Sequence, residues 1–116
     1  MKMAINQLLL DYRRHALEHG VATEAGDHRK ANRHHELLIA TLNALRQSGP
    51  DAERALTGFF TDENASVRCW AATHCLKIDE KQACSTLELL SATPGILGFN
   101  ARMVLAEWRK GTLRIP

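Results

Sequence analysis

A pattern of apolar residues in the second half of the chain repeats after about 29 residues. Such a period is typical of stacked helical hairpins, because each hairpin buries its apolar face only against a neighbour. Small residues in the repeat, such as Ala72 and Ala101, allow neighbouring helices to approach closely. The shift superposes these pairs: Ala55 and Cys84, Phe60 and Leu89, Val67 and Ile96, Trp70 and Phe99, Ala72 and Ala101, Cys75 and Val104, Leu76 and Leu105.

Apolar residues recur at spacings of three and four along the whole chain, and no segment alternates apolar and polar residues in the manner of a strand. The sequence therefore predicts an all-α fold. Glycine, proline and capping residues divide it into six helices. We expect them at about Lys2–His19 with Gly20 as the stop, Asp27–Gln47, Asp51–Phe60, from a cap at Asp62 or Asn64 to about Lys77, from Asp79 to Ala92, and Gly95–Lys110 with Gly111 as the C-terminal cap.

The helical spacing also predicts which side chains form the core. In the first helix the apolar side carries Ile5, Leu8, Leu9, Tyr12, Ala16 and Leu17. The third helix is expected to bury Ala55, Leu56, Phe59 and Phe60. The last helix is expected to bury Ile96, Phe99, Ala101, Val104, Leu105 and Trp108.

The length and charge of the chain limit the classes of protein to which it can belong. A chain of 116 residues with 45% hydrophobic residues is expected to form a single domain, residues 1–116, with a packed core. Its 15 basic and 13 acidic residues leave a net charge of +2, which excludes a strongly basic nucleic-acid arm. The N-terminal apolar run is too short for a signal peptide or a membrane span, so we expect a cytoplasmic protein.

No set of residues predicts catalysis, a cofactor or a metal site. Cys69, Cys75 and Cys84 lie within apolar patterns and are interpreted as small core residues in a reducing compartment. His15 and His19 have the i, i+4 spacing of a helix-borne zinc site, but further ligands are missing, and a solvated helix face is the simpler interpretation. Whether these two histidines bind metal stays open. We expect a protein that is not an enzyme.

A basic region in the first two helices could meet phosphates or an acidic partner. It contains Arg13, Arg14, Arg29, Lys30 and Arg33, but acidic residues interrupt it. Because phosphate contacts need clustered charge, a solvated surface is favoured over a nucleic-acid interface.

The segment VRCWAATHCLKI resembles the second helix of a HEAT or armadillo-type repeat. Over nearly its full length the chain resembles a small bacterial HEAT-like family of unassigned function. The motifs that carry this resemblance are Gly26-Asp27 with Asn32, Val67-Arg68 with Ala71-Ala72, and the segment Leu105–Gly111. The resemblance implies a short right-handed αα-superhelix of three hairpins, which presents a rigid protein-binding face.

The resemblance also implies a function, because some members of this family resemble immunity proteins of toxin systems such as contact-dependent growth inhibition. Such a protein binds a cognate toxin domain and neutralises it by occlusion. The alternatives are a general scaffold or regulatory protein that binds a cellular partner, and a weak nucleic-acid binder that uses the first hairpin. The oligomeric state is not predicted. The residues expected to bind the partner are Arg33, Glu36, Trp70, Thr73, Lys77 and Arg102.

Overall fold

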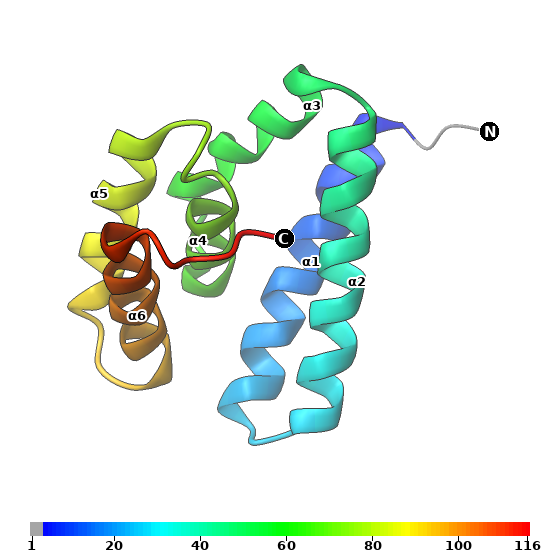
Figure 1. The fold of residues 1–116 in the computed structure, drawn as a ribbon. Coiled ribbons are helices and arrows are strands. Elements are labelled where there is room, and N and C mark those ends of the chain that lie inside the picture. Colours follow the sequence, from blue (N-terminus) through cyan, green and yellow to red (C-terminus); the bar gives the residue numbers. More distant parts are fainter. Residues whose placement is uncertain (1–3) are drawn as a thin grey trace. The chain divides into compact units, whose positions relative to one another are not determined.

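The fold is seen in a computed structural model that describes residues 4–116. Six α-helices and one 3₁₀ helix occupy this part of the chain, which contains no strand, so the predicted all-α class is confirmed (Figure 1). The elements are α1 (Ile5–Glu24), α2 (His28–Gln47), α3 (Pro50–Arg54), the 3₁₀ helix η1 (Ala55–Thr61), α4 (Ala65–His74), α5 (Glu80–Ser91) and α6 (Ile96–Lys110).

Several helix ends are formed by the side chains that the sequence marks as caps. The carboxylate of Asp79 accepts a hydrogen bond from the backbone N–H of Gln82, at 3.2 Å, and so caps α5. The side-chain oxygen of Asn64 accepts the N–H of Val67 at 3.0 Å and caps α4. These bonds satisfy N–H groups that have no partner within their own helix.

The first helix continues past the predicted stop at Gly20 and ends at Glu24. The turn is made instead at Gly26, whose φ of +72° is a conformation that glycine adopts without strain. The N–H of Gly26 donates to the carbonyl of Thr23, and the N–H of Asp27 donates to that of Ala22, which closes the helix. The extra turn also buries Ala22. The predicted start of this helix at Lys2 lies outside the described residues.

The predicted third and fourth helices are both too long. The α-helix that begins at Pro50 ends at Arg54 and is followed by η1, which contains the poor helix formers Thr57 and Gly58. In η1 Ala55 is exposed and the two phenylalanines are only half-buried, although all three were expected in the core. The fourth helix ends at His74 rather than near Lys77, because the N–H of Ile78 bonds to the carbonyl of Cys75 and forms a tight turn.

The chain divides into two compact units, and the first extends to Leu56. Within it α1 and α2 run antiparallel and side by side, and α3 packs against α2 (Figure 1). The buried side chains of α1 and α2 include Leu8, Tyr12, Ala16, Leu38 and Leu42. This unit is therefore a long helical hairpin with a short third helix.

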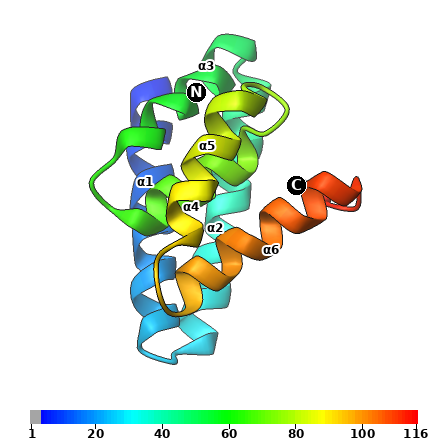
Figure 2. The same ribbon diagram turned by 90° about the vertical axis from the view of Figure 1, so that its left-hand side faces the viewer.

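The second unit covers Thr57–Pro116. Here α5 packs against both α4 and α6, and Figure 2 shows α6 inclined to α5. The tail after α6 packs Leu113 and Ile115 against the same core. The single domain predicted for residues 1–116 stays a prediction. The buried core of this unit consists of Cys69, Ala72, Leu76, Ala83, Leu87, Leu90, Ala101 and Leu105.

Candidate functional site

The last helix leaves a row of large apolar side chains uncovered. Ile96 is 47% exposed, Phe99 54% and Met103 45%. Their spacing of three and four residues places them on one side of α6, and we call this row the α6 stripe. Exposed apolar residues that lie together on one surface mark sites of interaction.

The α6 stripe contradicts the prediction that Ile96 and Phe99 belong to the core. At 3.6 residues per turn, Ala101 and Leu105 point to the side of α6 opposite the stripe. Both are buried against α5 and α4, and Val104 and Trp108 are half-buried beside them. Only one side of α6 packs against α4 and α5, so the opposite side, which carries the stripe, stays exposed.

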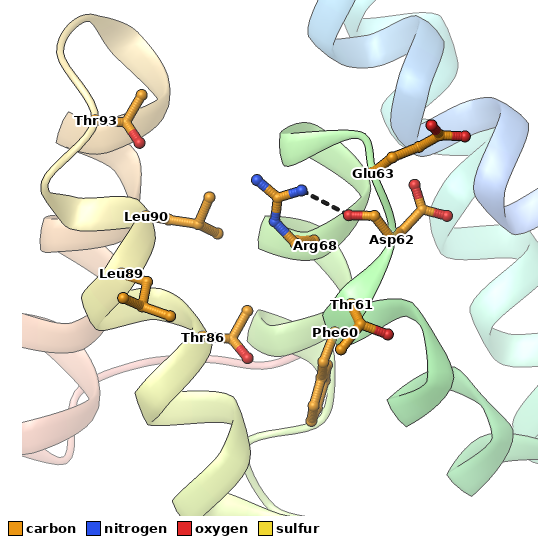
Figure 3. Close-up of a pocket in the computed structure, with 9 residues that line it drawn as sticks. All are labelled: Phe60, Thr61, Asp62, Glu63, Arg68, Thr86, Leu89, Leu90 and Thr93. Atoms are coloured by element: carbon orange, nitrogen blue, oxygen red, sulfur yellow. Dashed lines mark hydrogen bonds between the residues drawn. The ribbon is translucent and has the colours of Figure 1, made fainter.

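A hollow of about 410 Å³ lies elsewhere in the second unit (Figure 3). Figure 3 shows Leu89, Leu90 and Thr93 on one wall and the residues from Phe60 to Glu63 on the other. Between them the guanidinium of Arg68 donates a hydrogen bond of 2.6 Å to the carbonyl of Asp62. Arg68 therefore fixes the loop before α4.

The first two predicted partner-binding residues, Arg33 and Glu36, are both exposed on α2 in the first unit. They lie three residues apart, which places them on neighbouring positions of the helix surface. Arg33 also lines a cavity between α1 and α2. Both side chains are accessible to a partner.

The other four predicted residues belong to the second unit and have unequal access to solvent. Trp70 is half-buried, and its ring centroid lies 5.4 Å from that of His74. The hydroxyl of Thr73, also half-buried, donates to the carbonyl of Cys69 at 2.8 Å. Lys77 is exposed in the turn that follows α4.

Arg102 is exposed on α6, and its guanidinium donates to the carbonyl of Ser91, at 2.6 Å, at the end of α5. This hydrogen bond joins α6 to the end of α5, so Arg102 also stabilises the connection between these two helices. The partner-binding role of all six residues stays a prediction. The α6 stripe was not predicted, although the spacing of residues 96, 99 and 103 is regular, because each of these residues is of a type that is normally buried.

The two histidines of the predicted pair, His15 and His19, each lie beside a different histidine of α2. His15 is 7% exposed, and its Nδ1 lies 3.2 Å from Nδ1 of His34. The ring of His19 faces that of His35 with centroids 6.2 Å apart. In residues 4–116 no group of three or more His, Cys, Asp or Glu side chains is arranged to hold a metal ion.

Burial lowers the pKa of His15, and the positive charge of Arg14 and then His34 lower it further, although Asp11 opposes them. The pKa of His19 is lowered mainly by burial and further by the charge of His35 and then His34. Both changes favour the neutral imidazole in the folded protein. The contact between α1 and α2 therefore depends on uncharged histidines.

We expect the protein to lose stability on mild acidification. Unfolded histidines have pKa values of about 6.5, so below this pH the unfolded state binds protons that folded His15 and His19 resist. The contribution of these histidines to the free energy of unfolding should be constant between about pH 7 and 8 and should fall progressively below about pH 6.5. Urea titrations at pH 7.5 and 5.5 measure this difference. The His15→Gln variant should show a smaller fall, and an equal fall in both proteins would contradict the assignment.

The cysteines have no feature of reactive thiols. Burial raises the pKa of Cys69 to about 11, and it also raises that of Cys84, where Glu80 adds to the effect. A thiol with a raised pKa stays protonated at neutral pH and is a weak nucleophile. Cys75 is fully buried. These residues are therefore packing residues, as the sequence predicted.

Among residues 4–116 there is no helix whose length and apolar character would let it cross a membrane.

Comparisons with known proteins establish the fold and no more. No family model matches the chain, and no curated protein matches it significantly. The chain is similar to the crystal structure of the protein RPA1889 from Rhodopseudomonas palustris CGA009, with a TM-score of 0.89 and 22% sequence identity. The match covers 97% of this chain and 94% of that one. A bacterial protein thus has the same all-helical fold.

Proposed function

We propose that this chain is a protein-binding module and that the α6 stripe is its main docking surface. The observation that carries the proposal is the exposure of Ile96, Phe99 and Met103 on one side of one helix. Large apolar and aromatic side chains at the centre of an interface supply most of its binding energy, because the partner removes them from water. A rigid helix also loses little conformational entropy when a partner docks.

The partner that we propose is a cognate toxin domain, which an immunity protein of this kind would neutralise by occlusion in the cytoplasm. The resemblance of the sequence motifs to the HEAT-like family supports this choice. The terminal repeat of a solenoid normally presents a polar outer face, so an apolar stripe on the last helix favours a surface that a partner covers. Neutralisation requires tight binding, about −12 to −16 kcal/mol, and the α6 stripe would contribute hydrophobic anchors to it when the partner covers the stripe.

The test is capture of the toxin domain encoded beside this protein, measured by calorimetry. In the double variant Phe99→Ala/Met103→Ala we expect binding to weaken by about 30-fold or more, because two desolvated anchors are lost. Both side chains are exposed, so the fold should persist and the circular dichroism spectrum should not change. A matched control is Leu10→Ala, which removes a 62% exposed leucine of α1 from outside the stripe.

Unchanged capture by the double variant would overturn the α6 stripe as the docking surface. The variant Trp70→Ala/Arg102→Ala then tests the surface predicted from the sequence, and a loss of capture without loss of helicity would assign binding to it. The immunity function itself requires that loss of this protein is lethal only when the toxin is present. If the protein instead retains a common cellular partner in cells that lack the toxin, it is a scaffold.

A further inference from the structure

The first unit contains a second surface with a different chemistry. A cavity of about 530 Å³ lies between α1 and α2, in a unit that does not contain the α6 stripe. The seven residues that line it are Arg14, His15, Glu18, Lys30, Arg33, His34 and Leu37. Both helices thus contribute cationic side chains and imidazoles to one hollow.

The positive charge of this cavity is only weakly compensated. Its one carboxylate, Glu18, lies 3.9 Å from the ammonium nitrogen of Lys30, which is at the limit of an ion pair. Arg14 has an acidic neighbour, Asp11, at 3.6 Å, but the arginine side chain is 64% exposed. Among residues 4–116, Arg33 forms no ion pair. Exposed pairs of this kind contribute little, so the cations remain available to a ligand.

The imidazoles at the buried side of the cavity add hydrogen-bonding groups. His15 and His34 approach through their Nδ1 atoms, so one ring nitrogen donates and the other accepts in that contact. Each ring also has an Nε2 atom, and a neutral imidazole whose Nδ1 accepts carries its proton on Nε2. Three flexible cations and a donor imidazole form a suitable donor set for a compact anion with several oxygens.

We propose that this cavity is a binding site for the phosphate group of a phosphate monoester or of free phosphate. A monoester carries close to two negative charges and three terminal oxygens, which matches cations that converge from two helices. A nucleic-acid backbone offers only one charge for each phosphate, and it gains affinity by spreading contacts along a surface. Acidic residues interrupt the basic region outside the cavity, which favours a localised dianion over an extended strand.

The proposal is tested with the intact chain by two-dimensional ¹H–¹⁵N NMR. Inorganic phosphate and phenyl phosphate are titrated separately, with sodium chloride at matched ionic strength as the reference. The expected result is a saturable shift confined to the amides of residues 14–18 and 30–37. Stronger binding of phenyl phosphate would identify a monoester as the ligand, and equal binding would identify the phosphate group alone.

The key variant is Arg33→Gln, which removes one exposed cation from the cavity and should weaken phosphate binding at least about tenfold. The matched control is Arg29→Gln, because Arg29 is an exposed arginine of the same helix and does not line the cavity. We expect the control to bind nearly as well as the unaltered protein.

Three results would overturn the proposal. They are shifts no larger than those caused by sodium chloride, equal losses in the two variants, and binding of a single-stranded oligonucleotide in preference to phenyl phosphate. The last two would indicate a diffuse polyanion surface, which is the nucleic-acid alternative. Since the cavity and the α6 stripe belong to different units, none of these results bears on the α6 stripe as the docking surface.

Discussion

Replacement of Gly98 by alanine is expected to lower the free energy of unfolding by about 2 kcal/mol. A Cβ atom at this position would stand 1.7 Å from the carbonyl oxygen of Thr93 and 2.8 Å from its carbonyl carbon. The obstacle is backbone, and the N–H of Thr93 is held by the carbonyl of Leu90 at 2.9 Å. To admit the methyl group, α6 has to shift away from the α5–α6 connection. The steric cost of this shift exceeds the stabilisation of about 1 kcal/mol that alanine gives a helix interior relative to glycine.

Urea denaturation of the Gly98→Ala variant measures this loss. The control is Gly58→Ala, because a Cβ at Gly58 meets no atom within 4 Å and the residue has no positive φ. We expect the control to match the unaltered protein within about 0.5 kcal/mol. A Gly98→Ala variant of equal or higher stability would show that the Thr93 carbonyl does not press on α6.

The second large effect is expected at Leu87. This side chain is completely buried in the core of the second unit, where α5 packs against α4 and α6. Leu87→Ala removes buried carbon atoms and leaves a cavity, and such changes cost about 2–5 kcal/mol. Because a small domain has a total stability of about 5–15 kcal/mol, the variant should unfold at a much lower urea concentration. Ser85→Ala, on the exposed side of the same helix, should be nearly neutral.

The same variant tests the prediction that residues 1–116 form a single domain. In a single cooperative domain, loss of the Leu87 side chain lowers hydrogen-exchange protection in α1 and α2 as well as in α4 to α6. If the two units unfold separately, the amides of the first unit keep their protection. That outcome would contradict the single-domain prediction.

Local sequence signals predicted the helices and most of their ends. The cap of α5 could be identified in advance, and that of α4 could be narrowed to Asp62 or Asn64, because Asn64 and Asp79 act on N–H groups only three residues away. Gly111 likewise closes α6 as predicted, with a φ of +76°. Gly20 was misleading, since a single glycine is tolerated within a helix and the actual turn is made by Gly26.

The candidate sites were predicted less well than the helices. The apolar side of α6 could not be chosen from the sequence, because Ile96 and Phe99 are as hydrophobic as Ala101 and Leu105. Only some of the residues that line the cavity between α1 and α2 were predicted to lie together. Arg14, Lys30 and Arg33 were recognised as a basic region, but the contact between His15 and His34 joins residues 19 positions apart.

The sequence by itself determined the all-α class, the number of α-helices and most of the residues that cap them, because these depend on hydrophobic periodicity and on bonds between residues a few positions apart. Only the tertiary structure decided which side of α6 is exposed, which histidines of α1 face which histidines of α2, and why Gly98 requires a residue without a Cβ. Each of these outcomes depends on the neighbouring helix or loop that packs against the residue. A pattern within one helix contains no information about that neighbour.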